Sequence, residues 1–320
     1  GSPLTAADVK YTFDRIIDEG LPNAWRFATV TDVSAPDDTT VVFTLSAPTP
    51  TLLSHLGAYK HAGIVQQANV ESGEITTAPI GSGPFSLTGW TAGTSIELAR
   101  NEAYWGGAPA IDGVTYRFIP DATVALTDLQ TGAIHWTDNL PEQKTAELME
   151  SEDIVVDATS SLDYWYFAPN QAREAYSDVR VRQALAYGID RDAITQAAKF
   201  GNATVNQTAI PESSAWYVEY APYAYDPEKA RSLLEEAGVS DLTLDLIVTT
   251  QYPESVTAGQ VIQANLADIG ITVDVRVLEW ATWLDEEGSG NFDVFLLGWL
   301  GNLDPDDFSY NQHRSDAWAN

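Results

Sequence analysis

The sequence has 320 residues, is 44% hydrophobic and carries a formal net charge of −30, from 46 Asp and Glu against 16 Lys and Arg. This length and apolar content predict a globular protein that is large enough for two domains. The acidic charge argues strongly against nucleic acid or an anionic membrane as a partner. The absence of cysteine excludes disulfides, thiolate catalysis and Cys-ligated metals.

An acidic coat that keeps the protein soluble explains this charge, and a salty or extracellular habitat suits such a coat. No run of 18 apolar residues is present, so no transmembrane helix is predicted. The sequence begins GSPLTAADVK, without a basic region followed by an apolar one, and we therefore expect that a signal segment is not present in this chain.

The first third of the chain predicts a mixture of helices and strands. A capping box at Thr5 and Asp8 opens a helix that Gly20 ends. A strand over 39–45 and a short helix over 51–56 follow. The turn Gly81-Ser82-Gly83-Pro84-Phe85 then predicts unusual backbone dihedral angles or the close approach of another backbone, which makes Gly83 a candidate contact residue.

Period-two alternation predicts strands over 95–99 and 114–118, with an aromatic loop between them. A helix over 121–132, ended by its glycine, and a strand over 134–137 come next. An aromatic strand, YWYF, then leads into Pro169 and Asn170. Asn170 either forms an Asx-turn there or contacts a ligand.

The second half of the chain predicts a sheet that contains parallel strands. Helices follow Asp178 and Asp190, and the clearest helix runs from the N-cap Asp226 to the C-cap Gly238. Strands over 242–249 and 271–278 flank a helix over 255–269, which is a β-α-β unit with parallel strands. A helix over 280–287 and a strand over 291–297 complete the pattern.

The last of these strands leads into a turn-rich segment that contains Trp299, Asn302 and Asp304. A buried strand that ends in a loop with aromatic, amide and carboxylate groups often forms a ligand site in open α/β sheets. Trp299 either stacks on a ligand or closes the core, and Asn302 and Asp304 either bind a ligand amine or cap the turn. Trp216 lies in a loop after Pro211, where exposed rings are often functional.

Catalytic and metal-binding motifs are missing from the sequence. The four His residues are far apart, and neither a GxSxG nor a phosphate-binding glycine pattern occurs. Abundant Asp and Glu together with ten Trp leave one enzymatic alternative, a secreted carbohydrate-active enzyme or oligosaccharide-binding protein with a Trp-lined acidic cleft. We expect no catalytic residue, no metal and no cofactor.

Six segments together resemble the extracytoplasmic solute-binding proteins of family 5, which serve ABC importers of peptides, dipeptides and nickel. They are PLTAADVKYTFDRI (3–16), IGSGPFSLTGW (80–90), ELARNEAYWGGAPAIDGV (97–114), SDVRVRQALAYGIDRDAI (177–194), YDPEKARSLLEEAG (225–238) and LLGWLGNLDPDDF (296–308). They occur in the family's order and spacing over nearly the whole chain, and six segments in register are far more specific than any one of them.

The resemblance implies an α/β fold of the two-lobed periplasmic-binding-protein type (class II, the large peptide-binder type), incomplete at both termini. Residues 1–88 would be a segment of the small lobe, 89–166 part of the first lobe with a mixed sheet, and 167–320 the second α/β lobe, truncated at its C-terminal end. The ligand would lie between the lobes. The alternative of an interaction module that needs a missing segment to complete its fold remains open at this point.

The resemblance also implies roles for particular residues. Trp299 matches the family's cleft tryptophan, and Asn170 matches an Asn where the chain enters the last segment. Asn302 occupies a position that is Asp in di- and oligopeptide binders, whose carboxylate pairs with the peptide ammonium. An amide forms a weaker bond, so either Asp304 substitutes for it or the ligand lacks a free amine.

The sequence therefore predicts a non-enzymatic binding component of an ABC importer, outside the cytoplasm as a periplasmic or cell-surface lipoprotein. Its expected partners are a small-molecule or peptide ligand and a membrane permease, with no nucleic acid, and we expect a monomer. The candidate ligand-binding residues are Trp299, Asn302, Asp304, Asn170, Trp216 and Gly83.

Overall fold

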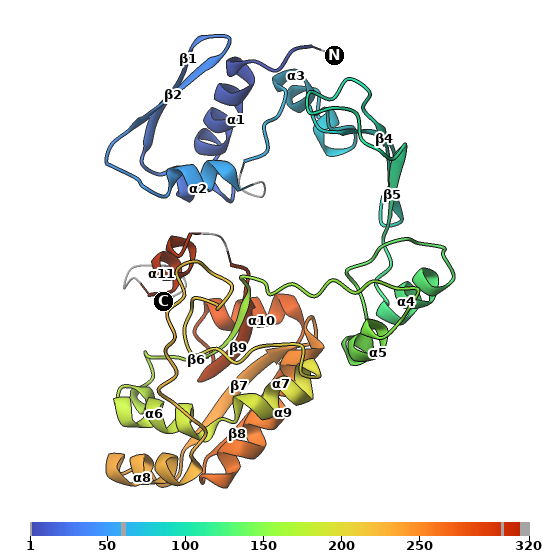
Figure 1. The fold of residues 1–320 in the computed structure, drawn as a ribbon. Helices are drawn as coiled ribbons and strands as arrows, with labels where there is room; N and C mark the ends of the chain where they lie inside the picture. The colour runs from blue at the N-terminus through green and yellow to red at the C-terminus, as the bar shows by residue number, and fades with distance from the viewer. Residues whose placement is uncertain (1, 59–61, 302–303, 314–320) are drawn as a thin grey trace. The chain divides into compact units, whose positions relative to one another are not determined.

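The computed structural model describes residues 2–58, 62–301 and 304–313. The chain forms two compact units, Gly1–Asn139 and Leu140–Asn320, each with its own helices and strands (Figure 1). The mixture of helices and sheets confirms the predicted α/β class. The predicted lobe segments 1–88, 89–166 and 167–320 refer to a complete two-lobed protein, and they stay a prediction.

The first unit opens with a helix packed on a hairpin. In α1 (Ala6–Asp18), the Asp8 carboxylate accepts a 2.8 Å hydrogen bond from the Thr5 N–H, as the capping box predicts. Gly20 ends this helix with a φ of 61°. The antiparallel strands β1 (Val30–Asp37) and β2 (Thr40–Leu45) pack on α1 through an apolar cluster. The buried members of this cluster are Phe13, Ile16, Phe27, Val30, Val33 and Leu52.

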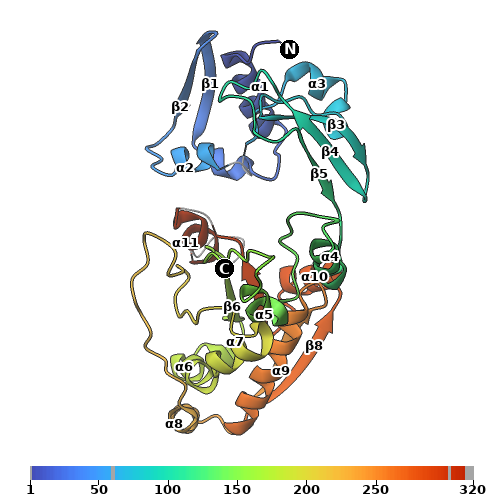
Figure 2. The same cartoon turned by 45° about the vertical axis from the view of Figure 1, so that its right-hand side comes forward.

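A second antiparallel sheet follows in the same unit and is seen best in Figure 2. Its order is β3-β4-β5, with β3 at Phe85–Thr91, β4 at Ser95–Arg100 and β5 at Gly113–Arg117. The unit also contains η1 (Ala24–Phe27), α2 (Leu52–Gly57), α3 (Gln67–Glu71), η2 (Glu74–Thr76) and α4 (Ala122–Gln130).

Two predictions for the first unit are wrong. The strand predicted over 134–137 is absent, because the Ile134 N–H is bonded to the Asp128 carbonyl at the end of α4 and is not available to a sheet. The unusual dihedral angles predicted for the glycine turn are also absent, since neither Gly81 nor Gly83 has a positive φ. A Cβ at Gly83 would meet nothing within 4 Å among the described residues, so no close contact on that side requires a glycine.

The second unit contains a four-stranded sheet of order β6-β9-β7-β8. Its strands are β6 (Tyr164–Pro169), β7 (Thr243–Thr249), β8 (Thr272–Leu278) and β9 (Val294–Trp299). Strand β7 is parallel to both β8 and β9, which confirms the predicted β-α-β unit, while β6 runs antiparallel to β9. The last strand continues to Trp299, two residues beyond its predicted end, because Tyr164 of β6 pairs with Trp299.

Helices cover both faces of this sheet (Figure 1). One face packs on α6 (Val179–Gly188), α7 (Arg191–Lys199), α8 (Pro227–Ala237) and α9 (Pro253–Asp268). The other face packs on α10 (Trp280–Gly288) through Ile247, Trp283, Phe292 and Phe295. The remaining elements are η3 (Glu142–Lys144), α5 (Thr145–Met149), η4 (Glu174–Tyr176) and α11 (Asp306–His313).

Candidate functional site

The carboxyl ends of β7, β8 and β9 meet at one edge of the sheet because these three strands are parallel. An aromatic residue follows or ends each strand: Tyr252 after β7, Trp280 after β8 and Trp299 at the end of β9. The antiparallel β6 starts at this edge and adds Trp165. Open α/β sheets bind ligands at the carboxyl ends of their strands.

Four rings form a continuous chain at this edge. Trp165 contacts Tyr252 with ring centroids 5.7 Å apart, and Tyr252 contacts Trp280 at 5.7 Å, both edge to face. Trp280 then stacks on Trp283 at 5.5 Å with 11° between the ring planes. The Trp165 ring lies over Gly298, where a Cβ would come within 3.2 Å of it. Trp165 and Tyr252 are each 37% exposed, so this apolar surface is open to a ligand.

A small cavity lies between α10 and the strands β6 and β9. Its volume is about 70 Å³, and it is lined by Tyr166, Trp283, Leu284, Glu287, Phe295, Leu297 and Trp299. Strand alternation explains this lining, because Phe295, Leu297 and Trp299 point to the α10 face while their neighbours point to the opposite core. Trp299 is therefore the last residue of β9 and also lines this cavity.

The ionisable groups of this cavity are the Glu287 carboxyl and the Tyr166 phenol. Burial raises the pKa of the Glu287 carboxyl above its ordinary value. Burial, reinforced by the charges of Tyr164 and Glu287, also raises the pKa of the Tyr166 phenol. Tyr166 is therefore neutral at physiological pH and can only donate or accept hydrogen bonds.

The turn after Trp299 is held against the start of β6. The Gly301 N–H donates a 3.0 Å hydrogen bond to Asp163 Oδ1. A Cβ at Gly301 would lie 2.0 Å from the Leu162 carbonyl oxygen, so only glycine fits here without a shift of the backbone. Asp304 Oδ1 accepts a 3.0 Å bond from the Asp306 N–H at the start of α11. The predicted contact residue Asn302 lies outside the described residues.

Trp216 is placed near the same edge. Its ring is 61% exposed, and the neighbouring Ser213 hydroxyl donates a hydrogen bond to the Ser161 carbonyl, just before β6. The loop that carries Trp216 is thereby tied to the segment that leads into the aromatic edge. A shared ligand site of Trp216 and Trp299 stays a prediction.

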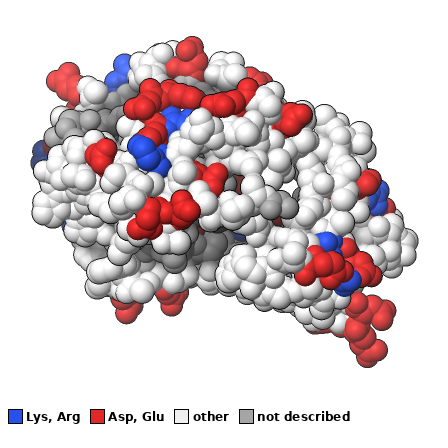
Figure 3. Space-filling model, turned by 90° about the horizontal axis from the view of Figure 1, so that it is seen from above, with Lys and Arg blue, Asp and Glu red and all other residues white. Residues whose placement is uncertain are grey.

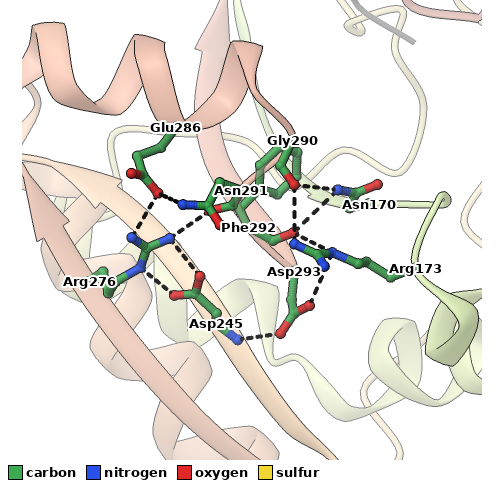
Figure 4. A network of polar contacts seen from close by, with 9 residues as sticks. All are labelled: Asn170, Arg173, Asp245, Arg276, Glu286, Gly290, Asn291, Phe292 and Asp293. Carbon is green, nitrogen blue, oxygen red and sulfur yellow. Dashed lines mark hydrogen bonds and ion pairs between the residues drawn. The ribbon is translucent and has the colours of Figure 1, made fainter.

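Asn170, in contrast, lies at the opposite end of the β6–β9 pair. Pro169 pairs with Val294, whereas Tyr164 pairs with Trp299, so the length of the ladder separates Asn170 from Trp299. The Asn170 amide donates to the carbonyls of Gly290 and Phe292, both at 3.3 Å (Figure 4). Its Oδ1 accepts from the Ala172 N–H at 3.1 Å, which is an Asx-turn.

The surroundings of Asn170 form a polar network that fixes the loop before β9 (Figure 4). Arg276 binds both oxygens of Asp245, at 2.7 and 2.6 Å, and Glu286 at 2.9 Å. It also donates to the Asn291 carbonyl at 2.7 Å. The Asp245 carboxylate raises the pKa of the Arg276 guanidinium. These contacts account for the position of Asn170, and a ligand-binding role for this residue is not favoured by them.

Gly83 belongs to the first unit, and its carbonyl accepts a 3.0 Å bond from the Asn101 amide. The sequence analysis did not identify Trp165, Tyr252, Trp280 and Glu287, which the structure adds as candidate site residues. The signal for Tyr252 and Trp280 was available, because each lies just after a predicted parallel strand. Nothing in the sequence pattern distinguishes Glu287 from the other acidic residues of α10.

The described residues contain no group of three or more His, Asp or Glu side chains with the placement that a metal ion requires. Within the described ranges, none of the helices combines the length and apolar character needed to span a bilayer.

Comparison with known proteins identifies the family of this chain. The family model for bacterial extracellular solute-binding proteins, family 5 (middle), matches residues 1–320. The glutathione-binding protein GsiB of Pectobacterium atrosepticum is 30% identical over 319 residues, which cover 97% of this chain and 62% of that protein. The dipeptide-binding protein of Escherichia coli is 31% identical over 303 residues, covering 90% of this chain and 56% of that protein.

A solved structure shares the fold. The periplasmic binding protein DppA of Helicobacter pylori, in complex with the peptide STSA, superimposes with a TM-score of 0.79 at 27% identity, covering 96% of this chain and 64% of that one. This likeness confirms the predicted periplasmic-binding-protein fold. The chain spans less than two thirds of the length of the relatives named here. On these matches, the chain belongs to family 5 of the bacterial extracellular solute-binding proteins.

Proposed function

We propose that this chain is part of the binding component of an ABC importer that captures a peptide and delivers it to a membrane permease. The observation that carries the proposal is the aromatic edge at the carboxyl ends of β7, β8 and β9, where Trp299 ends β9. Two relatives are named for glutathione and a dipeptide, and a solved structure of the same fold holds the peptide STSA. These names support a peptide ligand.

The chemistry of the edge suits such a ligand. Rings give a large contact area without requiring a particular side chain, so they tolerate variation in peptide sequence. Orientation then comes from polar groups in the turn after Trp299, where Asn302 offers an amide and Asp304 a carboxylate. We propose that these two residues contact the ligand's amino end, and that Trp216 extends the ring surface.

Binding without catalysis, a position outside the cytoplasm and a monomeric state belong to the same proposal. Family membership supports the first two, since the family is one of extracellular solute-binding proteins. The alternative of a carbohydrate-active enzyme gains no support from the family match. The acidic surface agrees with a partner other than nucleic acid.

Calorimetric titration with short peptides tests the proposal, on the purified protein in the longest form that its gene encodes. Trp299→Ala should weaken peptide binding by about tenfold, because a central aromatic contact is lost. Trp105→Ala is the matched control, since Trp105 is 83% exposed and belongs to the first unit's 101–107 loop. Unchanged affinity in Trp299→Ala, or no binding of any peptide by the wild type, would refute the proposal.

A further inference from the structure

The cavity beside Trp299 contains a carboxyl group without a counter-charge. Glu287 lines the cavity and forms no hydrogen bond or ion pair through its side chain with any residue in the described ranges. Its neighbour Glu286 is different, because Arg276 binds it at 2.9 Å. Strands β6 and β9, which form the opposite wall, carry no charged residue. The fold therefore pairs the Glu286 carboxylate with a guanidinium, whereas the Glu287 carboxyl lines the cavity without a cationic partner among the described residues.

A half-buried carboxylate without a partner is costly, and proteins normally pair such a group. The cost is visible here, since burial alone raises the pKa of Glu287. Nothing in the described part of the second unit requires a carboxyl at this position for packing, because the neighbouring contacts of α10 are made by Trp280, Trp283 and Leu284. The missing counter-charge is what a bound ligand can supply.

The walls of the cavity favour an alkyl stem with a cationic end. Tyr166, Trp283 and Trp299 present rings, and rings bind both methylene groups and cations through their faces. The cavity's volume of about 70 Å³ has room for several water molecules, given that one water needs about 10–15 Å³ on this measure. The end of a Lys or Arg side chain fits such a space.

We propose that Glu287 is a specificity-determining residue, and that the cavity beside Trp299 selects peptides that carry a basic side chain. The inference rests on the proposed function, because it places the ligand at the aromatic edge. The basic side chain enters between α10 and the β6–β9 pair, its stem contacts the three rings, and its ammonium or guanidinium pairs with the Glu287 carboxylate. A charge-assisted bond in a partly water-free cavity is stronger than one at an open surface.

Peptide pairs that differ only in charge test this inference by calorimetry at pH 7. The pairs are alanine tripeptides with Lys or norleucine at the first, second or third position, since norleucine keeps an alkyl stem and lacks the ammonium. For at least one position the wild type should bind the Lys peptide about tenfold tighter. Glu287→Gln should reduce this preference to less than about twofold and leave the norleucine affinity unchanged.

Asp285→Asn is the matched control, because Asp285 also belongs to α10 and is exposed without lining the cavity. It should retain the preference for Lys. A preference for Lys that survives in Glu287→Gln, or equal binding of the Lys and norleucine peptides by the wild type, overturns the inference and leaves the proposed function intact. A protein that binds no peptide overturns both.

Thermal unfolding gives a readout that is independent of binding. The raised pKa of Glu287 means that the folded state holds this proton more tightly than the unfolded state. The contribution of Glu287 to stability therefore falls as pH rises from the ordinary Glu pKa through the raised one. Glu287→Gln should melt at a higher temperature than the wild type above that window and at nearly the same temperature below it. A lower melting temperature for the variant at pH 7 would contradict the unpaired carboxyl.

Discussion

At the scale of single residues, two neighbouring carboxyls of α10, those of Glu286 and Glu287, differ in their contacts. Arg276 of β8 binds Asp245, Glu286 and the Asn291 carbonyl, and these contacts hold the loop before β9. Glu287, one residue further along α10, is left without such a partner among the described residues and lines the cavity between α10 and the strands β6 and β9. Glu286 thus has a structural contact, whereas Glu287 carries the proposed role in ligand selection.

Arg276 should be a major contributor to the stability of this unit. Arg276→Met removes four hydrogen bonds and leaves the Asp245 and Glu286 carboxylates without a counter-charge, so the free energy of unfolding should fall by about 2–3 kcal/mol. Arg276→Lys keeps the charge and loses the two-pronged contact with Asp245, so it should recover only part of the loss. Urea unfolding measures both variants. A loss below about 1 kcal/mol in Arg276→Met would indicate an exposed, weak pair.

At the scale of elements, caps and glycines fix where helices and strands end. Asp226 accepts from the Lys229 N–H at 2.8 Å to open α8, and Gly238 closes it with a φ of 73°. Gly132, which ends α4 as predicted, and Gly270, which follows α9, have φ values of 74° and 87°. These positions are local, so the sequence identified them without knowledge of the fold. Gly301 acts differently, through contact with a distant segment.

Gly301→Ala should damage the aromatic edge selectively. The new Cβ would lie 2.0 Å from the Leu162 carbonyl oxygen, so the turn after Trp299 must move away from β6. We expect a loss of about 1–3 kcal/mol in stability together with weaker peptide binding. Gly288→Ala is the matched control in the same unit, because a Cβ there meets nothing within 4 Å. Equal melting temperatures and affinities for the two variants would show that the turn adapts without cost.

At the scale of the whole molecule, the net charge of −30 is the main electrostatic feature. Asp and Glu are spread over the face seen in Figure 3, with few Lys and Arg between them. Like charges at this density repel one another and oppose the compact state. The Arg276 network and the Lys199 pairs with Glu142 and Glu254 neutralise only a small part of the excess.

Salt should therefore stabilise the protein. Raising NaCl from about 10 mM to 1 M shortens the screening length from about 30 Å to 3 Å, so the melting temperature at pH 7 should rise by several degrees. Near the sequence pI of about 4.1 the net charge vanishes, and the effect of salt should shrink or reverse. Calorimetric scans at both pH values measure this. A melting temperature at pH 7 that does not depend on salt would show that repulsion is already compensated.

The sequence by itself determined what depends on neighbours along the chain. Residues a few positions apart predict the capping box at Thr5, the caps of α8 and the β7-α9-β8 unit. They also single out Trp299 as a candidate residue at the end of a strand. The resemblance through six segments also gave the family correctly. The local pattern gave a wrong prediction at Ile134. The residues from 134 to 137 were predicted as a strand, but the Ile134 N–H is bonded to the end of a helix.

Only the tertiary structure decided which strand ends meet. Asn170 and Trp299 both flank strands, yet the antiparallel register of β6 and β9 places them at opposite edges of the sheet. The same register brings Trp165 to Tyr252 and Trp280, residues far apart in the sequence. The lack of a counter-charge at Glu287 among the described residues is also a tertiary effect, because Arg276 of β8 pairs with Glu286 and not with Glu287. Strand order, register and charge pairing join distant residues, and no local pattern in a single sequence encodes them.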